Sequence, residues 1–162
     1  MHRPAPVVRW AYLSLGSNIG DRREHLAAGV EVVRARDSIR LSSVYETEPQ
    51  GGVAQDDYWN LVIELETDAS AHELLERARR AEAARERVRD VRWGPRTLDV
   101  DVLLVGDEVS DDPDLLVPHP RMYERSFVLV PLHELAPALV SAAQLSAAVG
   151  KVTRLGTLDS LH

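Results

Sequence analysis

Cysteine is absent from this chain of 162 residues, which excludes disulfide bonds and metal sites built on thiolates. No apolar run approaches the ~20 residues that cross a bilayer, and residues 1–9 lack the apolar core of a signal peptide. Lysine occurs once, as Lys151, so nearly all cationic chemistry falls to arginine. We therefore expect an intracellular, cytoplasmic protein that makes no membrane contact.

The charge of the chain is acidic overall but uneven along the sequence. A formal net charge of −7 argues against a general nucleic-acid binder. The segment 77–96 nevertheless holds eight arginines and only three acidic residues. A cationic patch on an acidic body suits a small polyanion better than a long nucleic acid, and the alternative is a solvated helix face.

Hydrophobic periodicity predicts one domain with elements in the order βαββαβ. Strands are expected over residues 10–15, 38–47, 58–66 and 98–105. Helices are expected after the turn at 16–20, from the capping box at 70–73 toward 87, over 126–135 and over 142–149. The stretch between 107 and 125 is expected to be loop. This order is typical of a ferredoxin-like α+β sandwich, with helices packed on a largely antiparallel sheet.

The ends of the chain are less informative. Residues 1–9 are interpreted as an N-terminal extension and residues 141–162 as a C-terminal tail without recognisable chemistry. No internal repeat and no second domain is indicated, so residues 1–162 are expected to form a single domain.

The segment Arg92–Asp101 combines two arginines and two carboxylates around a Gly-Pro turn. Side chains in a strand alternate between faces, so Asp99 and Asp101 should leave the same face, about 7 Å apart at their backbones. Paired carboxylates with nearby arginines are suited to hold Mg²⁺ against a polyphosphate. A solvated acidic edge is the alternative for this common motif, and the flanking arginines and Trp93 favour the metal site.

The turn Gly16–Gly20 follows a strand and precedes a helix, where phosphate-binding loops are found. It lacks the Lys-Ser/Thr pair of a Walker loop and the spacing of a dinucleotide fingerprint. A tight turn at a helix entry is the simpler interpretation, although the turn could still line a pocket.

Tyr58 and Asn60 should share the strand face opposite the core. An aromatic ring beside an amide could bind a flat heterocycle by stacking and paired hydrogen bonds. Phe127, the only phenylalanine, could supply the second wall. The alternative is that both rings fill the core.

His119 lies between Pro118 and Pro120, in a stiff loop shortly before Arg121 and Arg125. A lone histidine is usually a surface residue, and the two arginines favour a binding role here. No pair of histidines has the helical spacing of metal ligands, so a zinc site is not expected.

Six separated blocks of the chain occur in a specific order and spacing. They are Leu15–Asn18, Ser43–Thr47, Asp57–Asn60, Arg92–Asp101, Val117–Met122 and Pro131–Pro137. Together they resemble the 6-hydroxymethyl-7,8-dihydropterin pyrophosphokinase family, over roughly residues 12–137.

The resemblance implies a ferredoxin-like monomer that transfers the β,γ-pyrophosphoryl group of ATP to the hydroxymethyl oxygen of the pterin and releases AMP, in folate biosynthesis. It implies two Mg²⁺ ions on Asp99 and Asp101, and catalytic roles for these aspartates with Arg92 and Arg96. The implied ATP-binding residues are Glu82, Arg89, Arg92, Arg96, His119 and Arg125. The implied pterin-binding residues are Thr47, Gln50, Tyr58, Asn60, Trp93 and Phe127.

Two residues depart from the pattern of the family it resembles. Arg79 stands where a glutamine is usual, and Glu86 stands where a glycine is frequent. The stretch between Arg87 and Trp93 is also a residue shorter than in some members. Two routes stay open for the hydroxyl proton, transfer to Asp101 and activation by a metal ion.

Two other classes of function are weighed against the enzyme. A binding module that senses a nucleotide without turnover has no need of a paired metal site. An RNA binder would need exposed aromatics on a basic sheet, which the acidic composition disfavours. We expect small-molecule substrates and no nucleic-acid partner.

Overall fold

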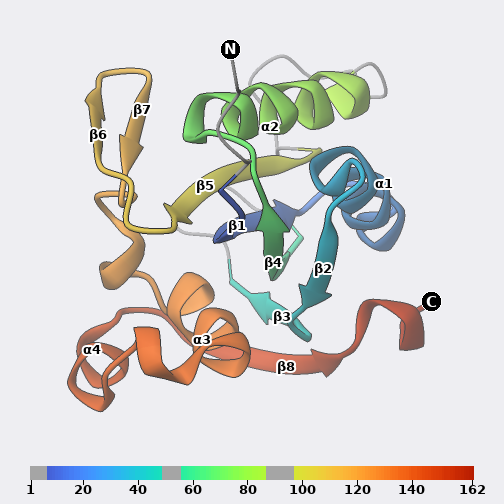
Figure 1. Ribbon diagram of the computed structural model, residues 1–162. Helices are drawn as coiled ribbons and strands as arrows, with labels where there is room; N and C mark the ends of the chain where they lie inside the picture. Colours follow the sequence, from blue (N-terminus) through green and yellow to red (C-terminus); the bar gives the residue numbers. More distant parts are fainter. Residues whose placement is uncertain (1–6, 49–55, 87–96) are drawn as a thin grey trace, which may run out of the picture.

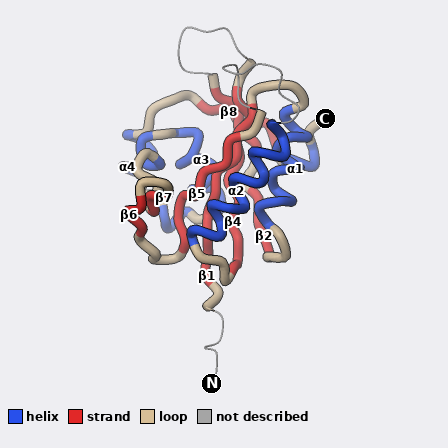
Figure 2. Tube along the Cα trace, turned by 90° about the horizontal axis from the view of Figure 1, so that it is seen from above, coloured by secondary structure: helices blue, strands red, loops and turns tan. Residues whose placement is uncertain are grey.

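The computed structural model describes residues 7–48, 56–86 and 97–162. A six-stranded antiparallel sheet lies between two layers of helices, as Figures 1 and 2 show from two directions. Helices α1 and α2 lie side by side over one face, and α3 and α4 lie on the other side. This arrangement confirms the predicted α+β sandwich with a ferredoxin-like order of elements.

The elements that build the two layers follow the chain in order. The strands are β1 (Arg9–Ser17), β2 (Ser38–Leu41), β3 (Val44–Thr47), β4 (Tyr58–Thr67), β5 (Asp99–Val105), β6 (Ser110–Asp112), β7 (Leu115–Val117) and β8 (Val152–Gly156). The α-helices are α1 (Arg22–Arg34), α2 (Ala71–Glu86), α3 (Ser126–Leu135) and α4 (Ala142–Ala147). Three 3₁₀ turns cover Met122–Glu124, Pro137–Leu139 and Leu158–Ser160.

The strands run β5-β1-β4-β3-β8 across the sheet, with β2 also paired to β4. Period-two alternation sends Leu61, Ile63 and Leu65 of β4 into an apolar cluster beneath α1 and α2. The cluster also includes Leu26, Val30 and Val33 of α1 and the buried face of α2. The hydroxyl of Ser70 accepts a hydrogen bond from the Glu73 backbone N–H at 3.2 Å, as expected of an N-cap.

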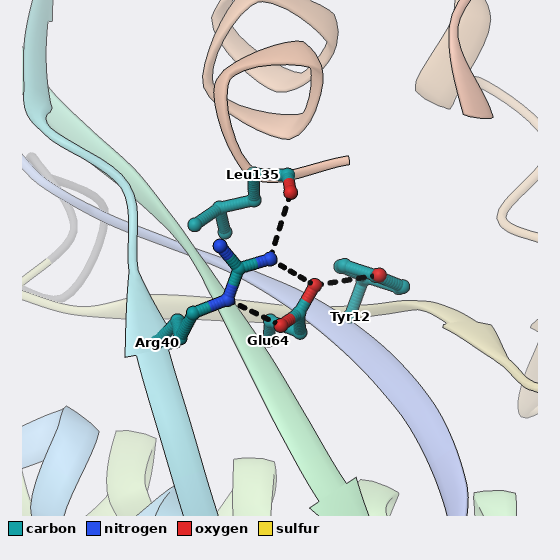
Figure 3. A network of polar contacts seen from close by, with 4 residues as sticks. All are labelled: Tyr12, Arg40, Glu64 and Leu135. Carbon is teal, nitrogen blue, oxygen red and sulfur yellow. Dashed lines mark hydrogen bonds and ion pairs between the residues drawn. The ribbon is translucent and has the colours of Figure 1, made fainter. Parts of the chain in front are cut away.

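The opposite face of the sheet is covered by α3 and contains a buried carboxylate, Glu64, paired with the exposed side chain of Arg40 (Figure 3). Glu64, 3% exposed, accepts hydrogen bonds from Arg40 Nε at 2.7 Å and from the Tyr12 hydroxyl at 2.7 Å. Arg40 also donates to the Leu135 carbonyl at the end of α3. Burial would raise the pKa of Glu64, but the hydrogen bonds from Arg40 and Tyr12 hold this pKa below its ordinary value.

The prediction of one strand over 38–47 is wrong at its centre, because the structure has two strands there, β2 and β3. The register shifts by one residue between the Leu41–Ile63 pair and the Tyr45–Asn60 pair. Ser42 lies at the break between the two strands. Its hydroxyl, rather than a backbone carbonyl, accepts the hydrogen bond of the Val62 N–H at 2.9 Å. Such a bulge replaces ladder bonds and reorients the strand that follows.

The C-terminal third differs from the expectation in two places. The stretch predicted as loop contains the β6–β7 hairpin. The tail contains β8, which pairs with β3 at the edge of the sheet. In the described ranges, no helix is long and apolar enough to cross a membrane.

Candidate active site

The two aspartates of β5 project to the same face, as the sequence predicts. Val100 and Val102 lie in the apolar cluster on the other side, while Asp99 and Asp101 are half-buried and line a pocket of about 500 Å³. Glu82 of α2 supports this strand, because its Oε2 accepts a hydrogen bond from the Val100 N–H at 3.0 Å. The backbone between the two carboxylates is therefore held by a side chain of α2.

Gly16 lies in the centre of the pocket floor. In the sheet it pairs with Asp99 on β5 and with Asn60 on β4. A Cβ atom at this position would lie 2.5 Å from Asn60 Oδ1 and 3.7 Å from Tyr58 Cδ1. The glycine is required here because the amide of Asn60 occupies the space that a side chain would need. Of the predicted turn 16–20, Gly16 lines the pocket from β1, while residues 17–20 do not line it.

The residues predicted to bind a heterocycle converge on the same pocket. Asn60 Nδ2 donates a hydrogen bond to Thr47 Oγ1 at 2.9 Å, joining β4 to β3 at its floor. Tyr58 and Phe127 are half-buried and line the pocket from β4 and α3. This set offers an amide, a hydroxyl and two rings, which suits a flat heteroaromatic ligand.

Cationic side chains lie on the side of the pocket nearest α3. Arg125 stands directly before this helix, with its guanidinium carbon 5.5 Å from the centroid of Phe127. Arg121 also lines the pocket. Both arginines retain the planar donor groups that bind phosphate oxygens in two-point contacts.

His119 lies beside this group rather than in the pocket lining. Its Nδ1 accepts a hydrogen bond from the Arg121 N–H at 3.2 Å, so the imidazole is oriented by the backbone of the loop. Burial lowers the pKa of His119, the Asp101 carboxylate opposes this shift, and Arg125 adds to it. The ring is therefore predominantly neutral near pH 7.

The donor set of the pocket fits magnesium. Among the residues that the structure describes, no three His, Asp or Glu side chains gather as a metal site. Mg²⁺ is commonly held by one or two carboxylates together with substrate phosphates, rather than by a complete protein cage. Asp99 and Asp101, beside arginines that can bind the phosphates, match that pattern.

The structure brings together part of the predicted site. The predicted residues that line the pocket are Thr47, Tyr58, Asn60, Asp99, Asp101, Arg125 and Phe127. Glu82 and His119 lie next to this group, through Val100 and Arg121, without lining it. Arg79, the departure from the family pattern, is exposed on α2. Gln50, Arg89, Arg92, Trp93 and Arg96 lie outside the described residues.

Sequence reasoning missed several residues of the pocket. Glu48 follows β3, Ser14 lies on β1, and the segment Val149–Val152 comes from the tail that was expected to carry no chemistry. Lys151, as the only lysine, was the one signal in that tail, and composition alone gave it no location.

The chain is similar in sequence to proteins of known function. The family model for 7,8-dihydro-6-hydroxymethylpterin-pyrophosphokinase matches residues 12–137. A 2-amino-4-hydroxy-6-hydroxymethyldihydropteridine pyrophosphokinase of Bacillus subtilis is 45% identical over 128 residues, covering 77% of this chain and 77% of that protein. A protein of the same name from Methylorubrum extorquens is 48% identical over 134 residues, covering 80% of this chain and 84% of that protein.

Proposed function

The chain belongs to the 7,8-dihydro-6-hydroxymethylpterin-pyrophosphokinase family. We propose how its pocket transfers the pyrophosphoryl group of ATP to the pterin. Members of the family are pyrophosphokinases of folate biosynthesis that use ATP, and this chain is such an enzyme. The proposed acceptor is 6-hydroxymethyl-7,8-dihydropterin, whose hydroxymethyl oxygen attacks the β-phosphorus of ATP in line. The products are the pterin diphosphate and AMP.

One observation carries this proposal. Asp99, Gly16 and Asn60 are cross-strand neighbours on β5, β1 and β4, so a carboxylate and an amide face one pocket across a glycine. A heterocycle beside Asn60 would therefore present its substituent toward the aspartates. Positioning of this kind supplies a large part of the catalysis in phosphoryl transfer.

In the proposed acceptor subsite, the rings of Tyr58 and Phe127 enclose the pterin while Thr47 and Asn60 bind its edge. The amide carries both donors and acceptors, which matches the alternating pattern of a pterin edge. Gln50 and Trp93 are proposed to complete this subsite.

In the proposed nucleotide subsite, the triphosphate lies between the aspartates and the arginines. Asp99 and Asp101 would hold two Mg²⁺ ions, which when bound neutralise charge on the phosphate oxygens. Arg125 and His119, together with Glu82, Arg89, Arg92 and Arg96, are proposed to surround ATP. Arg92 and Arg96 neutralise the group in transit, where electrostatic stabilisation counts most.

We further propose that residues 1–162 act as a single catalytic domain, that the enzyme works as a cytoplasmic monomer, and that its substrates are small molecules. The sheet and the helices on both of its faces support one domain, because the pocket takes side chains from strands and from α3.

The test is a coupled assay for AMP released from ATP, with and without hydroxymethyl-dihydropterin, at fixed Mg²⁺. We expect AMP release that depends on the pterin and a matching quantity of pterin diphosphate by mass spectrometry. Release without the pterin would indicate simple hydrolysis. Tight binding of ATP without any turnover would instead support a sensing module and contradict the proposal.

A further inference from the structure

The C-terminal tail returns to the pocket after the part of the chain that matches the family ends. The family match stops at residue 137, and α4 and β8 follow it. Four residues between these two elements line the pocket, Val149 through Val152, here named the closing segment. The two ends of this segment are attached to different walls of the pocket.

The first end is attached to the wall that carries Arg125 and Phe127. The Val149 N–H donates to the Glu124 carbonyl at 2.9 Å, and the Val149 carbonyl accepts from the Ser126 N–H at 3.1 Å. These two bonds flank Arg125 and form a parallel bridge with it. The position of the backbone that precedes Phe127 is therefore tied to Val149.

The second end is attached to the wall that carries Thr47. Val152 is the cross-strand neighbour of Thr47, at the start of the β3–β8 pairing. Thr47 in turn accepts the hydrogen bond of Asn60. Two residues, Gly150 and Lys151, thus separate the Phe127 wall from the Thr47 wall, and their conformation constrains the width of the pocket.

Lys151 is the one cation in this segment. Lys151 is exposed and lines the pocket. In the described part of the chain, its ammonium group makes no hydrogen bond or ion pair. Continuing the antiparallel register past the Thr47–Val152 pair places Lys151 across from Glu48, which also lines the pocket on the Thr47 side and forms no ion pair with it. An ammonium group there has three donors available for a ligand.

We propose that the closing segment is part of the acceptor subsite, with its backbone setting the separation of Phe127 from Thr47 and Lys151 donating a hydrogen bond to an acceptor atom of the bound heterocycle. This inference rests on the proposed function, because it takes the Thr47 side of the pocket as the pterin side. Lys151 would then influence which heterocycles the enzyme accepts.

Gly150 provides a probe of the backbone part of the proposal. Its φ of +112° is one that L side chains rarely adopt, and no atom lies within 4 Å of the position of an added Cβ. Gly150→Ala therefore changes the preferred backbone conformation without creating a clash. Lys151→Ala removes the ammonium without altering the backbone preference in the same way.

The experiment measures KM for the pterin, KM for ATP, kcat and Tm in Gly150→Ala and Lys151→Ala. Both variants should raise KM for the pterin, and for Lys151→Ala the rise should be on the order of tenfold, as expected for the loss of a charged hydrogen bond. Lys151→Ala should leave KM for ATP near its wild-type value. Lys151→Arg should recover most of the affinity because it keeps the charge. Binding of the pterin to the enzyme with Mg²⁺ and a non-hydrolysable ATP analogue should weaken in parallel.

Thr153→Ala is the matched control, since Thr153 is exposed on β8 and does not line the pocket. It should change neither KM. An unchanged pterin KM in Lys151→Ala, or an equal or larger rise in KM for ATP, would overturn the assignment to the acceptor subsite. Wild-type turnover of the pterin is measured first, so that failure of the proposed function is seen separately from failure of this inference.

Discussion

On β4, Ile63 packs beneath α1 and α2 with no exposed surface, whereas its neighbours Val62 and Glu64 face α3 on the other side. The first face is closed by aliphatic side chains. The second has an apolar cluster of its own and also holds the buried carboxylate of Glu64, paired with Arg40, and, further along the same strands, Asn60 and the pocket. Both faces therefore gain stability from buried apolar side chains, and the face beneath α3 also keeps polar groups positioned, at a cost in burial that hydrogen bonds must offset.

This contrast extends to the other strands that form the site. On β5, Val100 belongs to the apolar cluster while Asp99 and Asp101 line the pocket. The catalytic groups of the proposed reaction are therefore mounted on strands whose alternate residues are anchored in the core, which limits their motion.

The largest effect is expected from removing one charge on the pocket face. Asp101→Asn should lower kcat by about 10³, because it weakens metal binding and charge neutralisation, with little change in Tm. Steady-state kinetics at saturating ATP and Mg²⁺ and a thermal melt measure both quantities. Near-normal turnover would mean that the carboxylate pair does not hold the metal ions.

On the face beneath α1 and α2, a substitution should lower stability and leave kcat unchanged. Ile63→Ala should reduce the free energy of unfolding by about 3 kcal/mol, since it leaves a cavity in a fully buried site. The folded fraction should keep its kcat. Urea unfolding and activity at low temperature test this, with Ile63→Val as the milder control. A loss of kcat without loss of stability would contradict the interpretation that Ile63 stabilises the fold and takes no part in catalysis.

Glu64→Gln tests whether the buried carboxylate of Glu64 and its hydrogen bonds to Arg40 and Tyr12 stabilise the face beneath α3. We expect the free energy of unfolding to fall by about 2 kcal/mol at neutral pH, because the Arg40 and Tyr12 donors lose a charged acceptor. The pKa of Glu64 is lowered in the folded protein. Its contribution is therefore present above the unfolded value of 4.5 and is lost as the pH falls through the lower folded value.

The measurement is the unfolding free energy of both proteins as a function of pH. The difference between wild type and Glu64→Gln should be largest near pH 7 and should shrink below about pH 4.5. A difference that does not change with pH would show that the charge of Glu64 contributes nothing.

The smallest effect is expected at Gly16, where the two parts of the pocket meet. Gly16→Ala places a methyl group 2.5 Å from Asn60 Oδ1, so the amide must move. KM for the pterin should rise roughly tenfold, about 1.4 kcal/mol, with a smaller change in KM for ATP. An unchanged pterin KM would place the heterocycle away from Asn60.

Much of the fold was predictable from local pattern. The α3 helix has the predicted bounds, and the strand faces of β4 and β5 are as expected, because alternation belongs to the strand itself. The break at Ser42 was not predictable, since it depends on a hydroxyl that bonds the neighbouring strand. The role of Glu134 on α3 was not predictable either, because it accepts hydrogen bonds from residues of a distant segment, the Ser43 N–H at 2.8 Å and the Tyr45 hydroxyl at 2.6 Å.

The sequence by itself determined which side chains share a face and which family the chain resembles, since both follow from the order and spacing of residues along the chain. Only the tertiary structure decided that Val149–Val152 lie between Phe127 and Thr47. The reason is physical: the partner of an edge strand is chosen by hydrogen bonding and packing between distant segments, and no local periodicity records that choice.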